Sequence, residues 1–197
     1  MKLNELQQIH KLFFGHEEVA RALGITLASA RVAATRYARR GLLVRVKRNV
    51  YVQRERWNNA SLEDKFQLAN IAQVPSYISL TTALEHHGLT TQMQRDFIES
   101  VALMRTTQIQ VKQTLFSYTK IAGQLYFGFQ KKNDYFIATP EKALLDAVYL
   151  ASLGRYALDF SALEPERLDQ EVLAAMSEQF PARTRRLLLS HGYLSRA

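Results

Sequence analysis

The chain has 197 residues, 47% of them hydrophobic, and it contains no cysteine. This length allows one large or two small domains, and the lack of cysteine excludes disulfides and cysteine-ligated metal sites. The first residues carry no apolar run typical of a signal peptide, and no stretch approaches the roughly 18 apolar residues of a membrane span. A cytoplasmic protein that does not enter membranes is expected.

The net charge of +8 is concentrated at one end of the chain. Residues 1–56 hold 12 Lys or Arg and 4 Asp or Glu, whereas residues 57–197 hold 14 of each. Charge concentrated in this way is typical of a module that binds a polyanion. A membrane-surface helix also uses basic charge, but it needs a large apolar face beside it. We therefore expect a DNA-binding domain at residues 1–56 and a second domain at residues 57–197.

Spacing of apolar residues predicts three helices in the first domain. The third can be capped by Thr26 and stopped by Gly41, which tolerates the left-handed conformation. Two β-prone runs follow, joined by a turn in which Asn49 can take positive φ. Three helices and a two-stranded wing describe a winged helix-turn-helix, whereas a plain three-helix bundle would not explain nine basic residues between 27 and 56. The expected helices are 2–13, 16–23 and 27–40, and the strands are 42–46 and 50–52.

The faces of the third helix divide by chemistry. Ala30, Ala33, Ala34 and Tyr37 fall on one side, where small residues allow close packing. Side chains on the other side can bond base edges or phosphates, and Val32 can touch a thymine methyl group. The alternative is an ordinary solvent-exposed basic face without a binding role. The concentration of charge in this part of the chain favours DNA binding over that alternative. The expected DNA-binding residues are Ala28, Ser29, Arg31, Val32, Thr35, Arg36 and Arg39 on the helix, and Arg45, Lys47 and Arg48 on the wing.

The second domain is expected to combine a sheet flanked by helices, which gives an α+β fold class for the whole chain. Residues 53–60 are expected to be a connector, with Trp57 packed between the domains. Thr139, Pro140 and Glu141 form a strong helix start. The expected helices are 61–73, 79–88, 139–151, 165–180 and 181–190, and the expected strands are 77–78, 97–103, 108–111, 115–121, 125–130 and 135–138.

No pattern of catalytic residues is persuasive, so no enzyme activity, cofactor or metal site is expected. His86 and His87 are adjacent and point to different sides of a helix, whereas helical metal ligands are typically four apart. Glu141 and Lys142 lack the intervening residue of the nuclease acid-x-lysine element, and Glu141 and Asp146 are about 140° apart around a helix.

Three stretches together resemble the AbiEi antitoxins of bacterial type IV toxin–antitoxin systems: residues 39–51, 77–89 and 138–146. The family usually has glycine in the wing turn, where this chain has Asn49. The resemblance implies an N-terminal winged helix that binds promoter DNA and represses its own operon. It also implies a C-terminal domain that helps neutralise a nucleotidyltransferase-like toxin.

Three functions remain as hypotheses. The leading one is a DNA-binding antitoxin and autorepressor, whose partners are double-stranded operator DNA, a second copy of the chain on that DNA and a nucleotidyltransferase-like toxin. The second is a stand-alone transcription regulator whose C-terminal domain senses a ligand or dimerises. The third is an enzyme, such as a nuclease tethered to DNA. The adjacent open reading frame would distinguish the first two.

Overall fold

The computed structural model describes residues 3–195, which fold as an α+β protein in two compact units. The first unit comprises Met1–Leu68 with Val111–Gln113, and the second comprises Ala69–Gln110 with Thr114–Ala197. The first unit therefore extends twelve residues beyond the expected boundary at Arg56. Within the described residues, no helix is both long and apolar enough to cross a membrane.

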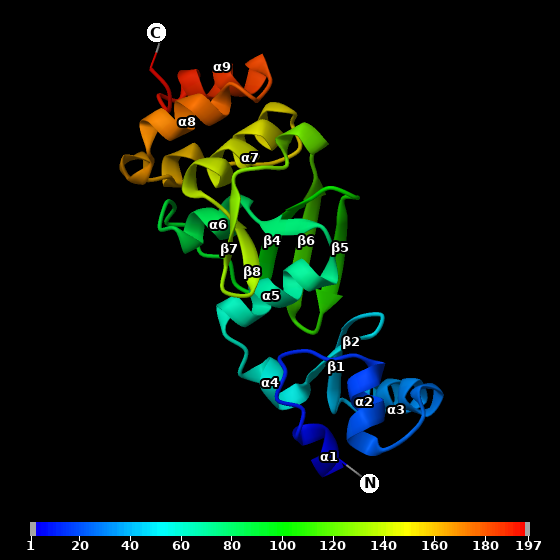
Figure 1. Cartoon of the computed structure of the whole chain (residues 1–197). Helices are drawn as coiled ribbons and strands as arrows, with labels where there is room; N and C mark the ends of the chain where they lie inside the picture. Colours follow the sequence, from blue (N-terminus) through cyan, green and yellow to red (C-terminus); the bar gives the residue numbers. More distant parts are fainter. Residues whose placement is uncertain (1–2, 196–197) are drawn as a thin grey trace. The chain divides into compact units, whose positions relative to one another are not determined.

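The first unit contains three short helices and a hairpin (Figure 1). They are α1 (Leu3–Gln7), α2 (His16–Leu23), α3 (Leu27–Arg39), β1 (Leu43–Lys47) and β2 (Val50–Gln53). β1 and β2 are antiparallel, and Val44 lies opposite Val52. Buried apolar residues from all five elements and from Phe14 form one core: Leu6, Phe14, Val19, Leu23, Ala30, Ala33, Ala34, Tyr37, Leu43 and Tyr51.

The first expected helix is much shorter than residues 2–13, so that prediction was wrong in length. The chain leaves the helix after Gln7 because Phe14 pairs with Tyr51, each backbone N–H donating to the other residue's carbonyl at 2.9 Å. The Gln53 side chain then donates to the carbonyl oxygens of Leu6 and Ile9, at 2.7 and 3.1 Å. These bonds tie the end of the short helix and the turn after it to the hairpin.

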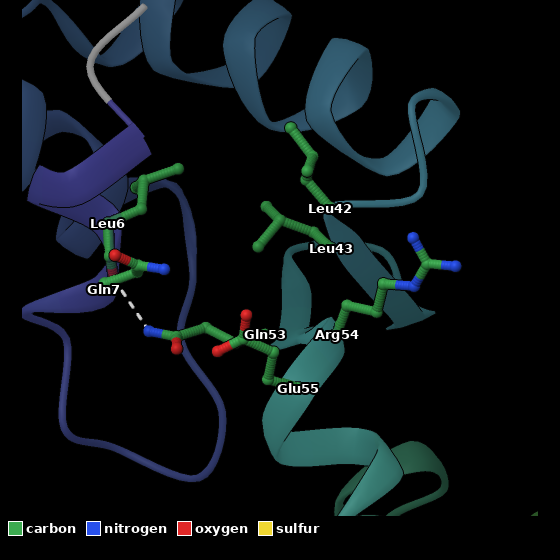
Figure 2. A pocket seen from close by; sticks show the side chains of 7 residues that line it. All are labelled: Leu6, Gln7, Leu42, Leu43, Gln53, Arg54 and Glu55. Atoms are coloured by element: carbon green, nitrogen blue, oxygen red, sulfur yellow. Dashed lines mark hydrogen bonds between the residues drawn. The ribbon is translucent and has the colours of Figure 1, made fainter.

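The expected connector is helical over α4 (Arg54–Asn58), and Trp57 is buried in the first unit. A pocket of about 160 Å³ lies between α1, the base of the hairpin and α4 (Figure 2). Its volume is below the roughly 300–1,000 Å³ of typical small-molecule sites. The Gln53 bond to α1 crosses it, so we assign it a packing role. Its lining residues are Leu6, Gln7, Leu42, Leu43, Gln53, Arg54 and Glu55.

A mixed six-stranded sheet forms the second unit, with strand order β5-β6-β4-β3-β8-β7. β3 is antiparallel to β4 and parallel to β8, and β4 is parallel to β6. The strands are β3 (Ser76–Ile78), β4 (Phe97–Ala102), β5 (Thr107–Val111), β6 (Thr114–Lys120), β7 (Phe129–Lys132) and β8 (Tyr135–Ala138). The expected strand at 125–130 was displaced, because residues Gly123–Leu125 form a short 3-10 helix instead.

Helix α7 (Pro140–Ser152) lies between the sheet and the two C-terminal helices (Figure 1). Its start is as expected, since Thr139 Oγ1 accepts the Lys142 N–H at 3.3 Å and Pro140 takes the first helical position. The expected helix at 165–180 is shorter, because Asp169 caps a new helix through the N–H groups of Glu171 and Val172. The other helices are α5 (Leu62–Ala72), α6 (Leu80–His86), α8 (Gln170–Ser177) and α9 (Ala182–Ser190).

Candidate nucleic-acid interface

Helix α3 has the buried face that its sequence predicts, and it ends one residue before the expected residue 40. Thr26 Oγ1 accepts the Ser29 N–H at 3.2 Å, which caps the first turn, and Gly41 has a φ of +72° just after the helix. Small side chains on the inner face let α3 lie close to α2 and β1. The inner residues Ala30, Ala33, Ala34 and Tyr37 are at most 8% exposed.

The outer face of α3 is open along its length. Val32 is 65% exposed, which is high for a branched apolar side chain. Thr35 donates its hydroxyl to the Arg31 carbonyl at 2.9 Å, so its oxygen is left to accept. Ser29 accepts from the Thr26 hydroxyl at 3.0 Å, which gives it a capping role as well. All seven expected helix residues are exposed: Ala28, Ser29, Arg31, Val32, Thr35, Arg36 and Arg39.

The hairpin presents its basic residues at its far end. Arg45 and Arg48 are exposed, while Lys47 is partly buried. The register shifts between Arg45 and Lys47, and Asn49 takes a φ of +60° in the turn. Asparagine tolerates this conformation better than most residues, so the turn forms without glycine.

The turn of the hairpin is bonded to the start of α2. Asn49 Oδ1 accepts the His16 N–H at 2.7 Å, and the bond joins residues 33 apart in sequence. Gly15 allows this approach, because a Cβ there would lie 3.1 Å from the Asn49 side chain. Together with the Phe14–Tyr51 pair, this bond holds the hairpin in one position relative to α2.

His16 is a residue of this surface that the sequence did not single out. Its Nε2 lies 3.3 Å from the Tyr51 hydroxyl. Burial, and then the positive charges of Arg31, Arg45 and Arg48, lower the pKa of His16 below its usual value. Three of the predicted arginines, from α3 and from the hairpin, thus lie near enough to His16 to affect its pKa. The only sequence signal for this was a histidine at a helix start, which is too common to be informative.

The basic side chains of this surface have no acidic partners. Among the described residues, none of Arg31, Arg36, Arg39, Arg45, Lys47 and Arg48 forms an ion pair. An ion pair between Lys11 and Glu18, at 2.8 Å, lies in the first unit and involves neither α3 nor the hairpin. Lys11 and the Gly15 N–H lower the pKa of Glu18 to about 2. Six cations without acidic partners on one helix and the hairpin that follows it can attract a polyanion at long range.

A buried polar network in the second unit joins two of the stretches that resemble the AbiEi sequences, residues 77–89 and 138–146. Lys142 and Asp146 form a fully buried ion pair. Tyr77 and Ser79 donate their hydroxyls to Asp146 Oδ2, at 2.9 and 2.8 Å. Phe127 and Phe180 place their ring centroids 5.2 Å from Lys142 Nζ. Burial lowers the pKa of Lys142, and the Asp146 carboxylate opposes that shift.

Because Lys142 and Asp146 have no exposed surface, the network packs the domain and does not meet solvent or substrate. The remaining acid of this stretch is also engaged, since Glu141 Oε1 accepts the Asp169 N–H at 3.2 Å. A second bond between the stretches joins His87 Nε2 and the Ala138 carbonyl at 2.8 Å.

No protein-family model matches the chain, and no curated protein matches it significantly. Among solved structures, the chain is similar to the RV2827C protein from Mycobacterium tuberculosis, with a TM-score of 0.60 and 13% sequence identity. The match covers 96% of this chain and 75% of that one. At this identity the likeness shows a shared fold.

Proposed function

We propose that this protein binds double-stranded DNA through a winged helix formed by α2, α3 and the β1–β2 hairpin. The observation that carries the proposal is the set of six basic side chains without acidic partners on α3 and the β1–β2 hairpin. In this arrangement α3 enters the major groove, where Arg31 and Arg39 reach base edges or phosphates. Lys47 and Arg48 on the hairpin contact the sugar–phosphate backbone.

The regulatory part of the proposal is that the bound DNA is the promoter of the protein's own operon and that the protein acts as an AbiEi-type antitoxin. Its support is the sequence resemblance. The stretches 77–89 and 138–146 meet in the buried network of Tyr77, Ser79, Lys142 and Asp146. Their likeness to the family therefore bears on how this domain packs, and a toxin would be held by other, exposed residues.

The test of DNA binding is a titration of labelled upstream DNA with the double variant Arg31→Ala/Arg39→Ala. Each lost base contact should cost about 1–3 kcal/mol and relax sequence preference. The matched control is Arg21→Ala/Arg54→Ala, which removes the same charge from exposed residues outside α3 and the hairpin. Equal affinity of the two double variants would refute the assignment of α3.

Salt dependence tests the hairpin separately. Lys47→Ala and Arg48→Ala should weaken binding to all sequences alike, and each should reduce the slope of log K against log salt by about one. A slope that stays at its wild-type value would remove the hairpin from the interface.

The antitoxin part is tested in cells that express the neighbouring toxin gene. The full-length Arg31→Ala/Arg39→Ala variant should lose repression and still rescue growth, because the proposal places toxin neutralisation in the second unit. If no nucleotidyltransferase-like gene is adjacent, or if the wild-type chain gives no rescue, the protein is better described as a stand-alone regulator.

A further inference from the structure

The second domain has no net charge, but its C-terminal residues are basic. Residues 179–197 hold four arginines and no Asp or Glu, whereas residues 57–178 hold ten Lys or Arg and fourteen Asp or Glu. A solubilising charge would be dispersed among acids, as it is in the rest of this domain. Three of these arginines, Arg183, Arg185 and Arg186, lie on α9, and this helix carries no acid.

One face of α9 borders a hollow of about 540 Å³, which we call the α9 hollow. Arg183, Arg186, Leu187 and Ser190 share a sector of about 100° around the helix axis, and Ser152 at the end of α7 completes the lining. Both arginines are exposed, and among the described residues neither forms an ion pair. Arg185 lies about 160° from Arg183 and does not line the hollow.

Helix stability does not account for these arginines. The dipole of a helix favours acids in its first turn, but α9 has none there and places Arg183, Arg185 and Arg186 in its N-terminal half. Its N-cap is Pro181, which supplies no side-chain bond. The helix is held instead by burial of Thr184 and Leu188.

The lining selects an anionic ligand rich in acceptors. Ser152 already donates to the Tyr149 carbonyl at 2.7 Å and Ser190 to the Leu187 carbonyl at 2.9 Å, so the arginines must supply the donors. Guanidinium groups bind phosphate oxygens in pairs. A protein partner would need an apolar centre, and Leu187 is the single apolar residue of the lining. The hollow is shallow and open to solvent, so a ligand there would be held mainly by the two arginines.

We propose that the α9 hollow binds a small phosphorylated ligand, with Arg183 and Arg186 as the phosphate-binding residues. This site belongs to the second unit, and it does not depend on the proposed DNA interface of the first.

The test uses the full chain and calorimetric titration with pyrophosphate, with ATP and with a duplex DNA of unrelated sequence. The variant is Arg183→Gln/Arg186→Gln, and the matched control is Arg185→Gln, which lowers the positive charge of the same helix on its other side. Wild type and control should bind ATP and pyrophosphate, and the double variant should bind both at least tenfold more weakly. Thermal melts of the three proteins should coincide, since all three arginines are exposed.

Two outcomes would overturn the proposal. One is that neither small probe binds, or that both bind the double variant as tightly as the control. The other is that only duplex DNA loses affinity in the double variant, which would make the hollow a backbone contact for nucleic acid and not a site for a small phosphorylated ligand.

Discussion

Asn49 has two separable tasks, and substitutions there test how the hairpin is held. Its backbone takes a φ of +60°, and its Oδ1 accepts the His16 N–H at 2.7 Å. Glycine keeps the backbone conformation and loses the acceptor. Alanine loses both, while aspartate retains an acceptor and tolerates the left-handed region. The three variants therefore separate the turn from the bond.

The expected losses in free energy of unfolding follow from these two terms. Removing the acceptor leaves the His16 N–H at the start of α2 without its hydrogen bond. This should lower the free energy of unfolding by about 1 kcal/mol, as the loss of other helix caps does. Placing a Cβ-bearing residue without local hydrogen bonding at positive φ costs about 1 kcal/mol more. Asn49→Gly should thus lose about 1 kcal/mol and Asn49→Ala about 2 kcal/mol, while Asn49→Asp should stay within about 0.5 kcal/mol of wild type.

The single tryptophan gives a local assay. Trp57 is 3% exposed and belongs to the first unit, so its fluorescence follows unfolding of that unit in the full chain. A unit of this size should lose about 4–8 °C in Tm per kcal/mol, which predicts about 4–8 °C for Asn49→Gly and about twice that for Asn49→Ala. Equal losses for glycine and alanine would refute the backbone argument. A glycine variant as stable as wild type would refute the argument from the hydrogen bond.

Three further predictions concern other parts of the chain. DNA binding should tighten as pH falls through the pKa of His16. The free protein holds that pKa below its usual value, whereas nearby phosphates of bound DNA would raise it. Affinity measured between pH 7.5 and 5.5 should show this dependence for wild type and not for His16→Gln. Lys142→Met should lower the free energy of unfolding, measured in urea, by about 3–5 kcal/mol, because the Asp146 carboxylate stays buried without its cation. Adding Asp146→Asn to this variant should restore part of the lost stability. A fragment of residues 1–68 should melt cooperatively and at a higher temperature than residues 1–56 by circular dichroism, because the shorter one lacks the buried Trp57; equal melting would favour the shorter domain.

Elements with local signals were predictable from the sequence. The bounds of α2 are as expected, and those of α3 differ by one residue, because capping residues and glycine stops act within a few positions. Thr139 and Pro140 marked the start of α7 for the same reason. Asp169 is a comparable signal for α8 that the sequence interpretation overlooked.

Elements that depend on distant partners were not predictable. Residues 8–13 were expected to continue the first helix, but Phe14 pairs with Tyr51, and no local pattern encodes that pairing. Gly128 lies so near Lys142 that a Cβ would approach its Cγ to 2.9 Å, and the chain around it is shaped by this side chain rather than by strand propensity. The exposed face of α3 followed from periodicity, whereas the place of His16 among Arg31, Arg45 and Arg48 required the folded unit.

The parallel pairing of β3 with β8 has a consequence for synthesis of the chain. It joins Ile78 to Ile137, about 59 residues later, and at 5–20 residues per second β8 leaves the ribosome about 3–12 s after β3. β4 pairs Ser100 with Ile78, so it emerges about 1–4 s after β3 and can pair with one side of it first. During the interval the other side is an unpaired strand edge, a template for aggregation with other nascent chains. Translation rate and growth temperature should therefore affect the yield of folded protein more strongly than the stability of the folded protein affects that yield.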